Sequence, residues 1–300
     1  MTRHNLGGLL AVLFWSCTIA FSRTLSEPLG PLTAGSLTFL LAGALGLAAQ
    51  ARRPGGIRGM LSLPRRYLLG CGALFVLYEL LLYVAVGLAA SRTQVLAVGL
   101  ANYLWPSLTL LFSLFFQPSR PNFWLVPGIG LALGGTWLAV WGDSGFSTLN
   151  LLQTESLLPV ALAALAAVLW GLYSNLTRLW SRGEGSAVPL FLLASGAAAL
   201  PLRFLTGEVS SWQPQVLPAL LFMAIFPAWL GYRLWDDAMQ HGDLVLVTAV
   251  SYSTPIFSTL MTLVVLQVPF TWTIGLAALL VMGGAILSKA GINEKKSPVG

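Results

Sequence analysis

Charge is the scarcest property of this chain. Asp, Glu, Lys and Arg together make up 9% of its 300 residues, whereas 56% are hydrophobic. A soluble protein of this size carries roughly a quarter charged residues and needs them on its surface, so the composition excludes one or two soluble domains. We therefore interpret the net charge of +6 as a signal of membrane topology, and expect no nucleic-acid partner.

The side chains of catalysis and metal binding are scarce too. The histidines are His4 and His241, and the cysteines Cys17 and Cys71 lie in apolar runs without a partner at metal-ligand spacing. The chain has no H-E-x-x-H motif, no phosphate-binding G-x-x-x-x-G-K-[ST] and no nucleophile paired with a histidine at membrane depth. We expect no cofactor and no bound metal, and an intramembrane enzyme is a distant alternative.

Long apolar runs fill the rest of the sequence. About 20 apolar residues cross a bilayer as a helix, which leaves room for about ten spans. The runs are continuous rather than alternating, which excludes a membrane β-barrel. The sequence predicts an all-α integral membrane protein with helices at 6–26, 32–50, 68–90, 94–116, 124–142, 157–180, 187–206, 215–239, 244–267 and 272–290.

The positive charges are unevenly shared between the two sides of the predicted bundle. If the N-terminus is cytoplasmic, three positive residues lie at the outer ends: Arg23, Arg92 and Arg203. The cytoplasmic segments then hold Arg3, Arg52, Arg53, Arg58, Arg65, Arg66, Arg120, Arg178, Arg182, Lys289, Lys295 and Lys296. The positive-inside rule therefore predicts that both termini are cytoplasmic.

The two halves of the sequence repeat. Residues that rarely align by chance recur at a shift of 155 in the first helix and 149 from the third helix on: Trp15 and Trp170, Arg23 and Arg178, Tyr83 and Tyr232, Tyr103 and Tyr252, Pro106 and Pro255. Residues 1–150 and 151–300 are therefore predicted to be two five-helix units. Because five is odd, the second unit enters the membrane from the opposite side, giving a 5+5 inverted-topology repeat around a central cavity.

Two helices of this repeat carry polar groups and a proline at their centres. Proline lacks a backbone N–H and crowds the preceding turn, so Pro106 and Pro255 predict kinks that act as hinges, with static kinks as the alternative. Asn102 and Ser251 precede these prolines by four residues. They could bind a substrate ammonium or carboxylate, or form an interhelical hydrogen bond.

Three stretches of the chain resemble the amino-acid exporters of the drug/metabolite transporter superfamily, in its ten-helix branch with two EamA repeats. They are Leu77–Glu79, Val98–Thr109 and Gly242–Pro255. The resemblance covers nearly the whole chain. It implies an inner-membrane exporter of aromatic and other amino acids, with a cavity lined by helices one, three, four, six, eight and nine. Many EamA repeats have a Glu after the fourth helix, where this chain has Gln117 and Gln267, so no role of that Glu is carried over.

Glu79 is the first candidate for the substrate site. An ionisable group halfway along a membrane helix is costly and usually faces a cavity or a partner. It could hold a substrate ammonium or exchange a proton, or it could be a neutral acid that fixes packing. Aromatic residues near the middle of the cavity-facing helices could stack on a ring or a cation, with ordinary packing as the alternative. The preferred set is Trp15, Tyr78, Tyr83, Tyr103, Trp170 and Tyr252.

A charged group on the eighth helix is the candidate gate. Arg233 lies three and four residues before Asp236 and Asp237, close enough to pair with them. The group lies towards the cytoplasmic end, where it could latch a gate, attract a carboxylate or serve as a structural ion pair.

The leading hypothesis is a secondary transporter that exports amino acids by alternating access. Its partners are a small-molecule substrate and membrane lipid, and ten helices in one chain can enclose a cavity in a monomer. The alternatives are a nucleotide-sugar carrier, which would need a basic cavity, and a cationic-drug carrier, which would rely on Glu79.

Overall fold

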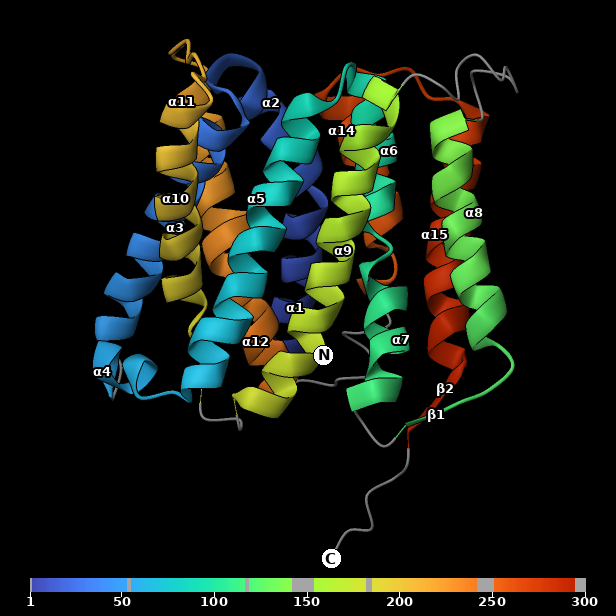
Figure 1. Cartoon of the computed structure of the whole chain (residues 1–300), viewed down its shortest axis with the longest axis horizontal. Helices are drawn as coiled ribbons and strands as arrows, with labels where there is room; N and C mark the ends of the chain where they lie inside the picture. The colour runs from blue at the N-terminus through green and yellow to red at the C-terminus, as the bar shows by residue number, and fades with distance from the viewer. Residues whose placement is uncertain are drawn as a thin grey trace, which may run out of the picture.

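The computed structural model describes residues 2–52, 55–116, 119–141, 154–181, 185–241 and 251–294. Its helices run side by side in one bundle (Figure 1). They are α1 (Arg3–Ser16), α2 (Thr18–Leu29), α3 (Pro31–Ala51), α4 (Gly56–Leu61), the π-helix η1 (Arg66–Cys71), α5 (Gly72–Leu88), α6 (Arg92–Asn102), α7 (Trp105–Phe116), α8 (Leu125–Trp141), α9 (Thr154–Trp180), α10 (Val188–Leu205), α11 (Val216–Met223), the π-helix η3 (Ala224–Gly231), α12 (Tyr232–His241), α14 (Thr254–Val265) and α15 (Trp272–Ala290).

Eight helical stretches in the described part are long and apolar enough to cross a membrane. They are Arg3–Leu29, Pro31–Ala51, Arg66–Leu88, Arg92–Phe116, Leu157–Trp180, Val188–Leu205, Val216–Trp235 and Trp272–Ala290. Two shorter apolar helices, Leu125–Ala139 and Thr254–Val265, lie where further spans are predicted. The chain is therefore an all-helical, multi-pass membrane protein. Of the predicted helix 244–267, residues 244–250 lie outside the described part.

The first predicted helix, 6–26, is in fact two helices that meet at Cys17. The Ser16 hydroxyl donates to the Val12 carbonyl at 2.8 Å, and the Cys17 thiol to the Leu13 carbonyl at 3.5 Å. Side chains that bond back to the preceding turn bend helices, which explains an interruption without Pro or Gly. The predicted span is therefore present as Arg3–Leu29, with a break at Cys17 that the sequence does not predict.

The predicted bend at Pro106 is a complete interruption, and it occurs twice. The fourth helix stops at Asn102 and restarts at Trp105, and the ninth restarts at Thr254 after a turn at residues 252–253. Pro106 has no N–H for the Asn102 carbonyl, and Pro255 has none for the Ser251 carbonyl. The Thr254 hydroxyl takes the place of that donor at 2.6 Å.

Two structural features were not predicted. The loop between the second and third spans contains the short helix α4. The strands β1 (Ser119–Pro121) and β2 (Ile292–Glu294) form a small antiparallel ladder in which Arg120 is in register with Asn293. The ladder joins the loop after α7 to the end of α15.

Small residues bring equivalent helices of the two halves into contact. A Cβ on Gly135 of α8 would lie 2.7 Å from the Ala277 carbonyl oxygen of α15. A Cβ on Gly196 of α10 would lie 2.8 Å from the Leu40 backbone nitrogen of α3. Such close approach requires glycine at both positions, so these two helix pairs pack along their backbones.

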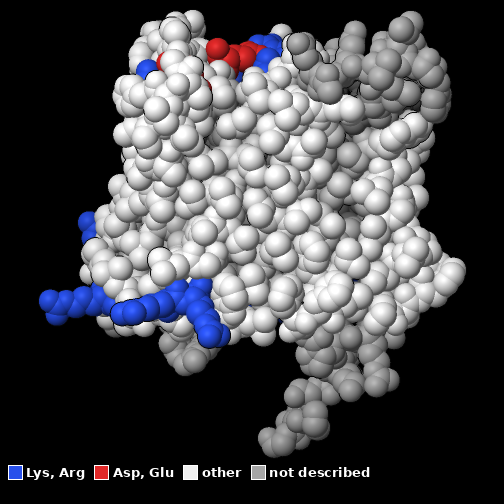
Figure 2. Space-filling view, viewed as in Figure 1, with Lys and Arg blue, Asp and Glu red and all other residues white. Residues whose placement is uncertain are grey.

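On the face shown in Figure 2, the exposed charged residues lie mainly towards the two ends of the bundle. One end, called here the arginine-rich end, holds α4 and η1 with the exposed Arg52, Arg58, Arg65 and Arg66. At the opposite end arginines mix with acids, as in the pairs of Glu27 with Arg23 and Arg92. The band between the ends is white in Figure 2, as expected for the lipid-facing surface.

Candidate functional site

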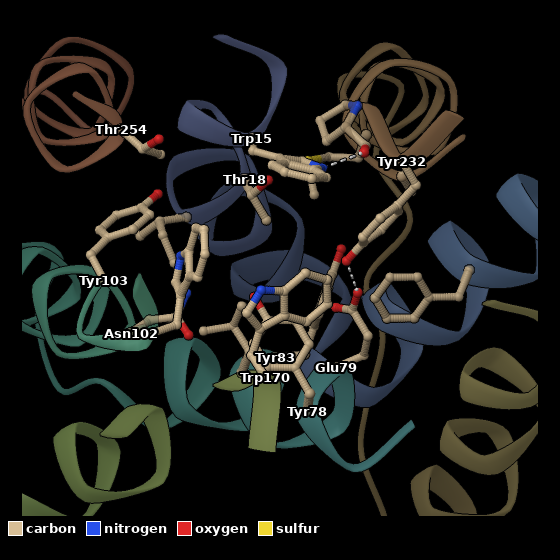
Figure 3. Close-up of a pocket in the computed structure, with 17 residues that line it drawn as sticks. Trp15, Thr18, Tyr78, Glu79, Tyr83, Asn102, Tyr103, Trp170, Tyr232 and Thr254 are labelled. Atoms are coloured by element: carbon tan, nitrogen blue, oxygen red, sulfur yellow. Dashed lines mark hydrogen bonds between the residues drawn. The ribbon is translucent and has the colours of Figure 1, made fainter. Parts of the chain in front are cut away.

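A cavity lies at the centre of the bundle (Figure 3). It encloses about 660 Å³ of space between atoms, part of it open to solvent. Its lining is Trp15, Thr18, Ile19, Phe39, Tyr78, Glu79, Leu82, Tyr83, Asn102, Tyr103, Trp105, Trp170, Met223, Pro227, Ala228, Tyr232 and Thr254. These residues come from the six helices expected to face a cavity, and Phe39 adds the second helix.

Trp170 of α9 is the centre of an aromatic wall. Its ring lies 4.7 Å from the ring of Tyr78 and meets those of Trp15 and Trp105 edge-on at 6.5 and 6.3 Å. Rings at these distances prefer tilted or edge-to-face contacts, which fix their orientation. The Trp15 indole N–H also donates to the Pro227 carbonyl in η3 at 3.1 Å. The wall therefore presents ordered ring surfaces to the cavity.

Glu79 supplies the carboxylate of the cavity. It lies on α5, is 4% exposed, and accepts a 2.8 Å hydrogen bond from the Tyr232 hydroxyl (Figure 3). Neither Lys nor Arg occurs among the described lining residues. A phenol and a carboxylate can hold each other in place while the second carboxylate oxygen remains available to a ligand.

Asn102 lies at the helix interruption between α6 and α7. Its side-chain oxygen is buried, and no hydrogen bond reaches that oxygen from the described part of the chain. Buried polar atoms normally have a partner, so this acceptor on the cavity wall is available to a hydrogen-bond donor.

The cavity brings together seven of the nine predicted substrate-binding residues: Trp15, Tyr78, Glu79, Tyr83, Asn102, Tyr103 and Trp170. Ser251 and Tyr252 are buried at the second helix interruption and do not line it. The nearby Thr254 does so instead. Pro106 and Pro255 lie behind the lining, each in the first turn after an interruption.

The predicted gate group on the eighth helix has an unexpected partner. Asp237 lies 2.7 Å from the His4 ring nitrogen, so this polar contact joins the start of α1 to α12. Arg233 is exposed on the same helix. The side chain of Asp236 lies outside the described part. No spacing along one helix could have indicated His4, which is 233 residues away.

Several lining residues were missed by the sequence analysis. Trp105, Tyr232, Thr18, Phe39 and Thr254 line the cavity but are not among the predicted site residues. The internal repeat could have indicated Tyr232, because Tyr232 is the equivalent of the predicted site residue Tyr83.

A model of the EamA-like transporter family matches the chain twice, over residues 3–141 and 157–289. The chain belongs to this family. The double match confirms that the EamA domain is duplicated, and this EamA protein is a transporter rather than an enzyme.

Two relatives of this EamA protein carry the name aromatic amino acid exporter YddG. The one from Escherichia coli (strain K12) is 33% identical over 291 residues, or 96% of this chain and 97% of the relative. The one from Salmonella typhimurium (strain 14028s) is 31% identical over 287 residues, or 95% and 96%. A solved crystal structure shares 31% identity and a TM-score of 0.69 over 96% of both chains.

Proposed function

We propose that this chain exports aromatic and other amino acids across the inner membrane by alternating access. The observation that carries the proposal is a central cavity whose walls are aromatic rings and whose carboxylate is Glu79. An aromatic side chain would stack on Trp170 and its neighbours. The substrate ammonium would pair with Glu79 and donate to the Asn102 oxygen. The names of the YddG relatives support this substrate class.

The transport cycle in this proposal exchanges the conformations of two inverted halves, residues 1–150 and 151–300. The paired interruptions before Pro106 and Pro255 support it, because they divide two cavity-facing helices at equivalent points. The outer parts of these helices would turn about the interruptions. The latch between His4 and Asp237, near Arg233 and Asp236, would fasten α1 to α12 during the cycle. One chain encloses the cavity, so a monomer suffices.

In the proposed orientation the arginine-rich end faces the cytoplasm, with both termini on that side. Arg52, Arg58, Arg65 and Arg66 support it, because they are exposed at one end without acids beside them in the sequence. Four further positive residues count towards this orientation from the sequence alone, because they lie outside the described residues: Arg53, Arg182, Lys295 and Lys296.

A second candidate is export of organic cations, and Glu79 in its aromatic surroundings favours it. Aromatic faces attract cations, and a nearby carboxylate adds to that attraction. A nucleotide-sugar carrier is not supported, because phosphates would require the basic side chains that the described lining lacks.

The test is counterflow in proteoliposomes that contain the purified protein. Vesicles are loaded with one amino acid at a time, and entry of labelled Phe or Trp is followed with and without a pH gradient. We expect exchange of Phe and Trp. Exchange of organic cations without any amino acid would favour the second candidate, and no exchange of either class would exclude both.

A further inference from the structure

A cluster of charges fastens the end of the bundle opposite the arginine-rich end. It is called here the Arg23 clamp and consists of Arg23, Glu27 and Arg92. Arg92 donates to both carboxylate oxygens of Glu27, at 2.9 and 2.7 Å, and Arg23 donates to one of them at 3.0 Å. Paired contacts of this kind are the stronger class of hydrogen bond. The clamp therefore joins α2 to α6.

The remaining donors of the clamp reach the ends of two further helices. Arg23 Nη1 donates to the carbonyls of Ala89 at 2.8 Å and Val86 at 3.0 Å, where α5 ends, and lies 3.5 Å from that of Gly87. Arg92 Nη1 donates to the Leu266 carbonyl after α14 at 3.2 Å. A cation is favourable at a helix C-terminus, where carbonyls lack helical partners. Four helices are thus held together at this end.

The internal repeat assigns equivalents to Arg23 and to the carbonyls that it binds, whereas the place of Glu27 is taken by Arg182. Arg23 corresponds to Arg178 at the shift of 155, and the residues beside it match as well, since Ser22 corresponds to Thr177 and Ser26 to Ser181. The acceptors Val86, Gly87 and Ala89 correspond to Trp235, Asp236 and Ala238 at the shift of 149. Arg178 lies in the last turn of α9, whose end packs against η1 at the arginine-rich end.

The two halves of the repeat differ in how the helices that carry these equivalent residues pack and end. α2 packs along α5, but in the described part the equivalent α9 and α12 do not pack in the same way. α5 ends at Leu88, so its last carbonyls are available to Arg23. The residue equivalent to Leu88 is Asp237, yet α12 continues to His241. The first half is thus fastened at the Arg23 end, and in the second half α12 extends past the point at which α5 ends.

We propose that Arg178 is the gating counterpart of Arg23. In the state that opens away from the arginine-rich end, α9 closes onto α12, and the Arg178 guanidinium binds the carbonyls of Trp235, Asp236 and Ala238. α12 shortens to match α5, and Asp237 leaves His4 to provide the acid that Glu27 provides in the first copy. The inference rests on the proposed alternating access, in which each half adopts the conformation of the other.

The two arginine contacts are mutually exclusive under this inference. Each stabilises one state, so removing either one shifts the population towards the other state. Arg23→Gln should favour the state open at the Arg23 end, and Arg178→Gln the state open at the arginine-rich end.

The test measures from which side the cavity is accessible. The reporter is Thr18→Cys in the cavity, in a Cys17→Ser, Cys71→Ala background, labelled with a membrane-impermeant maleimide in whole cells and in inside-out vesicles. We expect Arg178→Gln to change the ratio of outside to inside labelling about tenfold, the worth of one charged hydrogen bond, and Arg23→Gln to change it in the opposite direction. Arg65→Gln, an exposed arginine at the same end as Arg178, is the control and should leave the ratio unchanged.

A cross-linking experiment covers the case in which Arg178→Gln fails to fold. In the same cysteine-free background, a short bifunctional maleimide should link Arg178→Cys to Ala238→Cys with a yield that falls as the yield for Arg23→Cys with Ala89→Cys rises. The Arg178 inference is overturned if substrate changes the side of labelling but Arg178→Gln does not, and if position 178 forms no cross-link to position 238. That outcome leaves the transport proposal intact. Labelling from one side only, in every variant, overturns both.

Discussion

Glu79 depends on a residue from the other half of the chain for its position. The Tyr232 hydroxyl holds one carboxylate oxygen at 2.8 Å, and α5 and α12 meet at this bond. A carboxylate buried without such a donor would be costly at this depth. The pair therefore couples the central cavity to the packing of the two halves.

Glu79→Gln should lower Phe exchange by about tenfold to a hundredfold, because a charged hydrogen bond to the ammonium is replaced by a neutral one. Tyr232→Phe should give a smaller loss, and the double variant should lose less than the sum because both changes act on one interaction. Counterflow rates at matched protein levels measure this. The control is Tyr67→Phe, which removes a buried hydroxyl bonded to the Ala187 N–H outside the cavity. Additive losses would mean that Tyr232 does not act through Glu79.

Trp170→Ala should change which substrates are exchanged. Without the central ring, Phe and Trp lose their stacking surface, and we expect exchange of Phe to fall about tenfold relative to exchange of Ala. Competition between the two labelled amino acids gives this ratio directly. Trp137→Ala removes a half-exposed indole from α8, outside the cavity, and should leave the ratio as it is. An equal loss for both substrates would assign Trp170 to packing alone.

At the level of the helices, the paired interruptions determine how freely the bundle can move. Alanine in place of Pro106 and Pro255 restores two backbone N–H groups and allows the helices to continue through the breaks. We expect a kcat several-fold lower with KM little changed. Pro159→Ala, which changes a proline within α9 away from both interruptions, should leave kcat unaffected. An unchanged kcat in the double variant would make the interruptions static.

The packing of α8 against α15 depends on glycine in a position-specific way. Gly135→Leu would place its Cβ 2.7 Å from the Ala277 carbonyl oxygen, whereas nothing lies within 4 Å of a Cβ on the neighbouring Gly134. Overpacking costs about 1–3 kcal/mol, so Gly135→Leu should lower the Tm in detergent and Gly134→Leu should not. Thermal unfolding followed by size-exclusion chromatography compares the two. Equal melting temperatures would show that the two helices do not need this close contact.

The sequence predicted the helices well because apolar length is a direct property of the chain. It also located the interruption at Pro106, since proline removes a hydrogen bond wherever it stands in a helix. The break at Cys17 could not be predicted, because it depends on hydrogen bonds from the Ser16 hydroxyl and the Cys17 thiol to carbonyls of the preceding turn. The partnership of Asp237 with His4 escaped because tertiary packing, and not spacing, brings α1 to α12.

For the molecule as a whole, the arrangement of charge predicts its orientation. Reporter fusions after residue 300 should give fluorescent green fluorescent protein and inactive alkaline phosphatase, because a cytoplasmic terminus favours the first and excludes the second. A fusion within residues 89–91, at the Arg23 end, should give the reverse pattern and is the internal control. The same reporter active at both sites would contradict the proposed topology.

The contacts between equivalent helices have an evolutionary consequence. α3 packs on its counterpart α10, α8 on α15, and Trp15 meets Trp170, so equivalent elements of the two halves touch each other. Such self-complementary surfaces are those of a two-fold dimer. An ancestor of half this length could have assembled from two separate, oppositely inserted chains before one gene held both. Coexpression of residues 1–150 and 151–300 as separate polypeptides should then rebuild a working transporter. The linker would serve to fix the ratio of the two halves and their relative direction.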